Sequence, residues 1–303
     1  MSLEVKQLTK LYNSQRALNS ISFEAKSGQV LGFLGPNGAG KSTTMKIASG
    51  YLLPDEGDVW VNGLSVSEHP KQVSKMIGYL PEHNPLYLDM YVKEFLLFMA
   101  SLYRFKGLSA KSKIATIIEK CGLGAEQHKK IGQLSKGYRQ RVGLAKALVH
   151  DPEVIILDEP TTGLDPNQLL EIRKLIREIG KDKTLILSTH IMQEVEAICE
   201  KVVIIHQGEI VAQDLLQNLK AGEGLTSVFL ETEEQLYMEW FESLNGIQEI
   251  RPINDRQFEF LANSATDLRK ELLTVVQERN LSLLSVRLQE RNLESIFHQL
   301  TQS

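Results

Sequence analysis

Cysteine is scarce in this sequence: the 303 residues include only Cys121 and Cys199, which lie far apart and in no metal-binding or redox spacing. A disulfide framework and a cysteine zinc site are therefore excluded. Long hydrophobic runs are absent too, because the longest, around Phe95–Met99, falls far short of the ~20 residues that cross a bilayer. The first residues, Met1–Lys6, contain no apolar segment typical of a signal peptide. We expect buried, reduced thiols and a chain that stays outside the lipid.

Neither sign of charge is in large excess. Lys and Arg total 34 and Asp and Glu total 38, which gives a formal net charge of -4. A nucleic-acid-binding protein usually concentrates basic residues on one face, so this balance indicates no nucleic-acid partner. With 42% hydrophobic and 24% charged residues, the composition is that of a globular protein with one large core and a smaller one.

The first domain, expected at 1–220, alternates short β-branched or apolar runs with longer helical patterns. This alternation predicts an α/β fold with a largely parallel sheet. The expected strands are Leu3–Leu8, Ile21–Ala25, Val30–Leu34, Asp58–Val61, Met76–Leu80, Val154–Leu157, Thr184–Ser188, Val202–His206 and Ile210–Gln213. The expected helices are Lys41–Gly50, Val92–Tyr103, Ala110–Cys121, Gly137–Val149, Asn167–Gly180 and Met192–Cys199. The span of about 81–150 has almost no strand pattern and is predicted to be an inserted helical subdomain.

A smaller second domain is expected at 225–303, after a Gly-containing linker at Ala221–Gly224. Its predicted elements are strand Thr226–Leu230, helix Glu234–Leu244, strands Gln248–Pro252 and Gln257–Leu261, helix Thr266–Arg279, strand Ser282–Arg287 and helix Leu293–Leu300. The β-α-β-β-α-β order predicts a ferredoxin-like α+β sandwich with an extra terminal helix.

A phosphate-binding loop follows the expected strand Val30–Leu34. The pattern G-x-x-x-x-G-K-[ST] is matched by Gly35, Pro36, Asn37, Gly38, Ala39, Gly40, Lys41 and Ser42, with Thr43 next. In such a loop the backbone N–H groups and the following helix N-terminus surround the β-phosphate. We predict that Lys41 bridges the β- and γ-phosphates of ATP and that Ser42 offers its hydroxyl to Mg²⁺. A Gly-rich turn formed by chance would lack this strand, loop and helix in register.

Two carboxylates end the apolar run Val154–Leu157. A run that is apolar on both faces belongs in the middle of a parallel sheet, so Asp158 is expected at the ligand-binding edge beside the loop. There it would hold Mg²⁺ through water, and Glu159 would act as general base toward the attacking water. Taken alone, the pair would be a solvated turn; beside a phosphate-binding loop, it predicts ATP hydrolysis.

A third motif, Leu134–Arg141, precedes this strand, with Ser135 as a good N-cap and Gly137 in the first helical turn. It resembles the signature of the ABC ATPases, usually Leu-Ser-Gly-Gly-Gln. The resemblance implies that Ser135 and Gly137 grip the γ-phosphate held by a second copy, giving a head-to-tail homodimer. The sequence departs from the usual signature at Lys136 and Tyr138. Lys136 would either attract the nucleotide or point to water.

Further motifs over roughly 1–215 fit the same resemblance. It implies that Tyr12 stacks on adenine, that Asp165 belongs to a loop crossing the dimer seam, and that His190 is a catalytic switch contacting the γ-phosphate. The family's glutamine after the strand Met76–Leu80 is replaced by Glu82, a carboxylate that could still engage nucleotide and Mg²⁺ or its water but donates no hydrogen bond when ionised.

The resemblance also implies an integral-membrane permease as partner, with the protein cytoplasmic and peripheral on the inner face of the membrane. The segments 84–88 and 95–98 are candidates for permease docking or for internal packing. The C-terminal segment, with its closing 292–297, resembles the accessory domain of ATPases of ABC-2-type exporters, and the whole chain resembles the gliding-motility-associated ATP-binding proteins. That domain shows no catalytic cluster, and we expect it to serve dimerisation or regulation.

Other functions fit less well. A soluble, non-transport ABC ATPase of translation or DNA repair usually carries two cassettes or a long coiled coil, and neither pattern occurs here. A non-catalytic ATP-binding regulator would not need Glu159 and His190, both of which are present. A kinase or GTPase would lack the signature motif.

Overall fold

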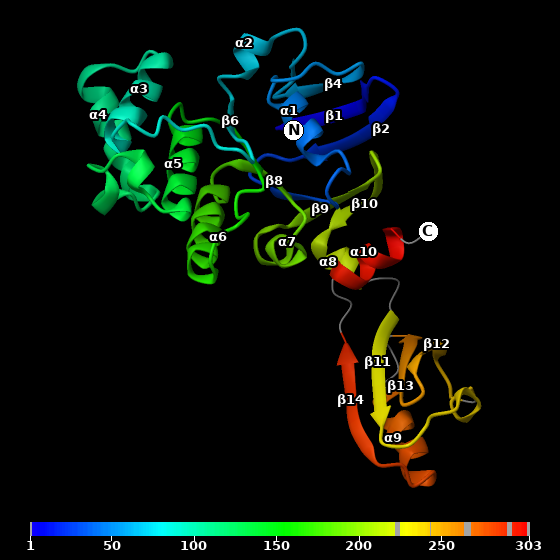
Figure 1. Cartoon of the computed structure of the whole chain (residues 1–303). Helices are drawn as coiled ribbons and strands as arrows, with labels where there is room; N and C mark the ends of the chain where they lie inside the picture. The colour runs from blue at the N-terminus through cyan, green and yellow to red at the C-terminus, as the bar shows by residue number, and fades with distance from the viewer. Residues whose placement is uncertain (1, 222–224, 243, 264–267, 290–292, 302–303) are drawn as a thin grey trace. The chain divides into compact units, whose positions relative to one another are not determined.

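The computed structural model describes residues 2–221, 225–242, 244–263, 268–289 and 293–301. The chain divides into two compact units, Met1–Leu215 and Leu216–Ser303 (Figure 1). The domain boundary expected after residue 220 falls inside a short helix, α8 (Leu216–Ala221). The rest of the expected linker, 222–224, lies outside the described residues.

Two sheets form the first unit. The larger has the order β10-β9-β3-β8-β7-β6, in which every neighbouring pair is parallel except β9 and β10. The other is an antiparallel sheet with the order β2-β1-β4-β5. The strands of the unit are β1 (Leu3–Tyr12), β2 (Gln15–Ala25), β3 (Val30–Leu34), β4 (Glu56–Val61), β5 (Leu64–Ser65), β6 (Ile77–Leu80), β7 (Val154–Asp158), β8 (Thr184–Thr189), β9 (Lys201–His206) and β10 (Glu209–Leu215).

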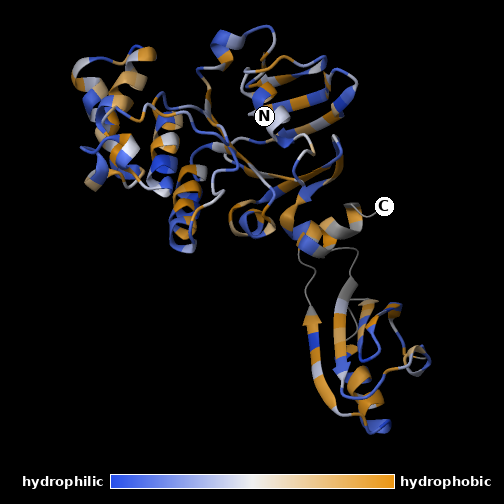
Figure 2. Cartoon of the chain, in the orientation of Figure 1, coloured by the Kyte–Doolittle hydropathy of each residue, from blue (hydrophilic) through white to orange (hydrophobic). Residues whose placement is uncertain are grey.

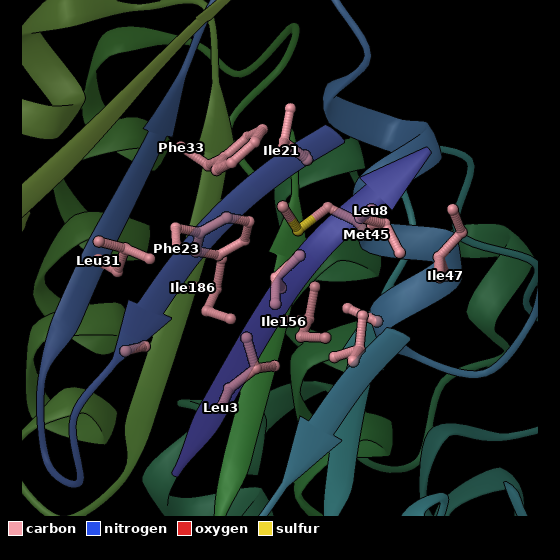
Figure 3. Packing of buried hydrophobic residues seen from close by; sticks show 14 of the residues in the cluster. Leu3, Leu8, Ile21, Phe23, Leu31, Phe33, Met45, Ile47, Ile156 and Ile186 are labelled. Carbon is pink, nitrogen blue, oxygen red and sulfur yellow. The ribbon is translucent and has the colours of Figure 1, made fainter. Parts of the chain in front are cut away.

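The main core lies between these two sheets (Figure 3). Phe23 of β2 meets Phe33 of β3 with ring centroids 5.1 Å apart. Ile156 of β7 and Ile186 of β8 extend the same layer, and Met45 of helix α1 (Lys41–Ala48) packs into it. Because α7 (Met192–Ile198) packs against β3 and β8, the central strands are buried along their whole length, as the uninterrupted apolar run of β7 predicts.

Helices fill the span between β6 and β7. They are α3 (Val92–Leu102), α4 (Gly107–Lys120) and α5 (Lys136–Leu148), with two short 3₁₀ turns, Gly124–Glu126 and Ile131–Gln133. The remaining helices of the unit are α2 (Pro70–Val73) and α6 (Pro166–Gly180). Figure 2 shows hydrophobic and hydrophilic residues interspersed along these helices. No helix within the described residues is long and apolar enough to cross a bilayer.

The second unit contains one antiparallel sheet with the order β12-β13-β11-β14, which is the ferredoxin-like strand order that the sequence predicts. Its strands are β11 (Leu225–Thr232), β12 (Ile247–Asn254), β13 (Gln257–Asn263) and β14 (Leu283–Gln289), and its helices are α8, α9 (Leu268–Glu278) and α10 (Leu293–Thr301). The start of the expected helix at Thr266 and Asn292 of the closing segment lie outside the described residues.

One predicted element of this unit is wrong. The helix expected over Glu234–Leu244 is reduced to a 3₁₀ turn, Met238–Trp240. The start of this stretch is bonded to distant loops: the Glu233 N–H donates to the Ser282 carbonyl at 3.0 Å and the Leu236 N–H to the Asp255 carbonyl at 2.7 Å. The Glu234 carbonyl, which the first turn of a helix would use, accepts from Thr232 Oγ1 at 2.9 Å. These bonds hold the chain in an extended path, and only the turn bonds around Met238–Trp240 form within the stretch.

Candidate active site

The phosphate-binding loop joins β3 to α1 at the carboxyl edge of the parallel sheet (Figure 1). Gly40 has φ of 109° and an added Cβ there would lie 2.7 Å from the Ala17 carbonyl oxygen, so glycine is required. The Lys41 side chain is 5% exposed, and its ammonium donates to the carbonyl oxygens of Gly35, at 2.8 Å, and Pro36, at 3.1 Å. The buried positive charge of Lys41 is therefore held against the backbone of the phosphate-binding loop.

Asp158 ends β7 beside this loop and is 1% exposed. Burial raises the pKa of its carboxyl group; hydroxyls of Ser188 and Ser42 oppose that shift, and the charges of Glu159 and Glu82 add to it. Its Oδ1 atom is buried and has no hydrogen-bond partner among the residues that the structure describes. A buried acceptor without a donor is the state of an oxygen whose natural partner is a cation or ordered water.

Glu159 follows Asp158 and contacts both the phosphate-binding loop and strand β8. Its backbone has φ of 49°, an uncommon conformation for a residue with a side chain, and its N–H donates to the Ser188 carbonyl at 2.9 Å. Both carboxylate oxygens lie 2.9 Å from His190 Nδ1, and Oε1 lies 3.6 Å from Lys41 Nζ. Glu159, His190 and Lys41 thus form one cluster.

A cavity of about 340 Å³ opens over this cluster. Its lining contains nine of the residues predicted from sequence and two that were missed: Asn37, Gly38, Gly40, Lys41, Ser42, Thr43, Glu82, Glu159 and His190, with Ala17 and Thr162 in addition. Thr162 Oγ1 donates to Glu159 Oε2 at 3.3 Å, which its place just after the acidic pair could have suggested. Ala17 belongs to no sequence motif. It lies in β2, and only the folded chain brings it to the cavity.

The oxygens at this edge suit a hard divalent cation. A second cavity, of about 370 Å³, shares Ser42 and Glu82 with the first and also includes Asp158. No group of three or more His, Cys, Asp or Glu residues is placed to hold a metal anywhere in the described residues. A carboxylate and a hydroxyl that leave most positions to water and phosphate fit Mg²⁺, which keeps part of its hydration shell.

Seven predicted site residues line neither cavity. Three of them, Gly35, Pro36 and Ala39, belong to the phosphate-binding loop itself. Ser135 is exposed and caps α5, accepting from the Tyr138 N–H at 3.4 Å. Asp165 caps α6, accepting from the Gln168 N–H at 2.9 Å. Tyr12, 46% exposed, lies at the end of β1, and Gly137 is buried in the first turn of α5.

Lys136 is exposed, and its ammonium lies close to Gly163. An added Cβ on Gly163 would lie 2.2 Å from Lys136 Nζ, so the ammonium lies against the loop that leads into α6. An added Cβ on Gly137 would likewise lie 2.6 Å from Gln168 Oε1. The signature segment and the loop at Gly163–Asp165 are therefore packed together within one chain.

Comparison with known proteins identifies a family and several relatives of this chain. The sequence model of the family described as "ABC transporter" matches residues 18–162. The linearmycin resistance ATP-binding protein LnrL of Bacillus subtilis is 32% identical over 306 residues, covering 99% of this chain and 98% of the relative. The bacitracin transport ATP-binding protein BcrA of Bacillus licheniformis is 36% identical over 220 residues, covering 72% of this chain and 71% of the relative.

Solved structures agree. The structure of an ATP-binding subunit of an ABC transporter superposes with a TM-score of 0.66 at 30% identity, covering 73% of this chain and 92% of that chain. CbiO1 from Clostridium perfringens, part of the transporter complex CbiONQ, gives a TM-score of 0.65 at 30% identity over 70% of this chain and 88% of that chain. The chain therefore belongs to the ATP-binding proteins of ABC transporters, and it is a subunit that binds and hydrolyses ATP.

Proposed function

We propose that two copies of the chain close head to tail around two MgATP and thereby drive a separate integral-membrane permease. The observation that supports this most is the place of Ser135: an exposed helix cap that lies outside the cavity holding Lys41 and Glu159 of its own chain. A helix N-terminus with a hydroxyl that can still donate its hydrogen and a glycine amide is an anion receptor. In this proposal it completes the site of the second copy.

In this proposal the predicted site residues divide the work on ATP. The loop amides and Lys41 bind the β- and γ-phosphates, Tyr12 stacks on adenine, and Asp165 lies in the loop at the dimer seam. Glu159, within 2.9 Å of His190 Nδ1, takes a proton from the attacking water, while His190 contacts the γ-phosphate. These groups position and stabilise charge, which is most of what phosphoryl transfer requires.

Mg²⁺ is the expected cofactor. Ser42 would hold it directly and Asp158, with its unpartnered Oδ1, would hold it through water, with Glu82 at the same edge. When bound, the ion neutralises charge on the β- and γ-phosphates. Glu82 accepts from water as an ionised acid but cannot donate as the family's glutamine does.

The helical insertion offers a surface for the permease. Tyr87 is 57%, Leu88 50%, Tyr91 43% and Phe98 39% exposed, and Tyr87 contacts Phe98 with centroids 5.9 Å apart. The neighbouring Phe95, 2% exposed, packs inside the subdomain, which favours 84–91 and Phe98 over the rest of 95–98 as the docking segment. Attachment there would place the protein on the cytoplasmic face of the membrane.

Export is the transport direction that we propose. The relatives named for bacitracin transport, Nod factor export and linearmycin resistance support an exporter of the ABC-2 type over a soluble, non-transport ATPase. We further propose a place in the gliding-motility group, to be tested by loss of surface spreading in a deletion strain. The C-terminal unit would serve dimerisation or regulation, and its deletion should change assembly or the ATPase rate.

Mixing two inactive variants tests the head-to-tail dimer. Lys41→Ala disables the phosphate loop and keeps the signature, whereas Ser135→Arg does the reverse. A mixed dimer then contains one intact composite site, so an equimolar mixture should recover about one quarter of the parental rate if subunits exchange freely and sites act independently. A mixture as inactive as its components, with exchange confirmed by labelled subunits, contradicts the composite site. Copurification of the chain with a permease from native membranes tests the partner.

A further inference from the structure

Glu194 is a buried acid that the proposed hydrolysis does not use. It lies in the first turn of α7 and is 0% exposed. Its Oε1 atom has no hydrogen-bond partner in the described part of the chain. Because burying a carboxylate with an unsatisfied oxygen costs free energy, stability alone does not explain an acid at this position.

The other oxygen of Glu194 fixes one hydroxyl. Thr189, the last residue of β8 and also 0% exposed, donates its Oγ1 hydrogen to Glu194 Oε2 at 2.8 Å. The same Oγ1 accepts from the Ile191 N–H at 3.1 Å. A hydroxyl has one hydrogen, so donating it to the carboxylate turns the lone pairs toward the Ile191 amide.

These two bonds join the residues on either side of His190, Thr189 and Ile191, to each other and to Glu194. The backbone before it ends in β8, and the backbone after it is tied to the Thr189 hydroxyl. The backbone that carries the imidazole is thus held in one conformation, and Nδ1 lies 2.9 Å from both oxygens of Glu159. Misplacement of a reacting group by about 1 Å can cost about 100-fold in rate, so a clamp on this turn has catalytic consequences.

We propose that Glu194 is a positioning residue: acting through the Thr189 hydroxyl, it holds His190 in the geometry that hydrolysis needs. The inference rests on the proposed role of His190 in contacting the γ-phosphate. It assigns a function to a buried acid whose Oε1 has no hydrogen-bond partner among the described residues.

Paired substitutions separate positioning from folding. Thr189→Val keeps the side-chain shape and removes both bonds, whereas Thr189→Ser keeps them. We expect kcat to fall about 10-fold or more in Thr189→Val, with KM for ATP nearly unchanged, and to stay within about twofold in Thr189→Ser. The matched control is Thr184→Val on the same strand, whose buried hydroxyl bonds Gly28 and Lys26; it should lower the melting temperature and leave kcat unchanged.

A second pair tests the acid itself. Glu194→Gln keeps an oxygen that accepts from Thr189 and should retain most of the parental kcat, whereas Glu194→Met should match Thr189→Val. In a His190→Ala background, Glu194→Met should lower kcat no further, because it acts through the histidine. Parental rates in His190→Ala would overturn the proposed role of His190. A slow His190→Ala with parental kcat in Thr189→Val and Glu194→Met, or additive losses in the double variant, would overturn only the positioning inference.

Discussion

Replacing Glu159 by Gln removes one negative charge and one base while keeping the size of the side chain. The carboxylate is 6% exposed, its two oxygens lie 2.9 Å from His190 Nδ1, and Oε1 lies 3.6 Å from Lys41 Nζ. The amide can still accept a hydrogen bond from one neighbour through its single oxygen, so the fold should be preserved. It cannot take a proton from water.

The expected loss follows from the role of a positioned base, which contributes about 10²–10⁴ to the rate. That range corresponds to about 3–5 kcal/mol of barrier, at about 1.4 kcal/mol for each factor of ten. ATP binding should not weaken, because the substitution also removes a negative charge facing the γ-phosphate.

Phosphate release at saturating MgATP measures the rate, and equilibrium binding of a fluorescent ATP analogue measures the affinity. The control is Glu153→Gln, the same substitution just before the opposite end of β7, where the exposed Glu153 accepts from Asn62. Under ATP, the Glu159→Gln protein should also elute as a dimer. Parental hydrolysis by Glu159→Gln would refute the assignment of this residue as the base.

Three further outcomes are expected. Gly143→Ala would place a Cβ 2.1 Å from Asn84 Nδ2, displacing that side chain, and should cost about 1–3 kcal/mol of unfolding free energy in urea titration; an unchanged midpoint would contradict it. Burial lowers the pKa of His150 below its usual 6.5, so the unfolded chain takes up the proton first and stability should fall as the pH drops through 6.5. His150→Gln should flatten that part of the melting-temperature profile; an identical slope would exclude His150 as its source. Phe260→Ala, at a fully buried site 4.9 Å from the Phe241 ring, should cost about 3–5 kcal/mol and speed hydrogen exchange in β11 and β13 but not in β7.

Local patterns sufficed for the parts of the site that lie on one element. The apolar run of β7 predicts a strand buried on both faces, and the structure has that strand with Asp158 at its end. The sequence likewise predicts Ser135 as the N-cap of the following helix, and the structure shows this cap on α5. In each case the signal and its consequence lie within a few residues.

Contacts between residues far apart in the chain could not be predicted from local sequence patterns. The spacing of Leu236, Trp240 and Leu244 fits a helix, yet backbone bonds to Ser282 and Asp255 tie the start of this stretch to distant loops. Ala17 reaches the cavity only because β2 folds back over the loop. The bond from Thr189 to Glu194 is close in sequence, but only the fold shows both side chains fully buried.

The helical insertion leaves the sheet at the carboxyl end of β6 and returns at the amino end of β7. The two strands are parallel neighbours, with Ile77 opposite Val154 and Leu80 opposite Leu157, so the two connections lie at opposite ends of this strand pair. Because β6 is the edge strand, the pair stands at one side of the sheet. Exchange of the whole insertion between relatives would carry Ser135 and the proposed permease surface with it, and would leave the phosphate-binding loop, Glu159 and His190 in place.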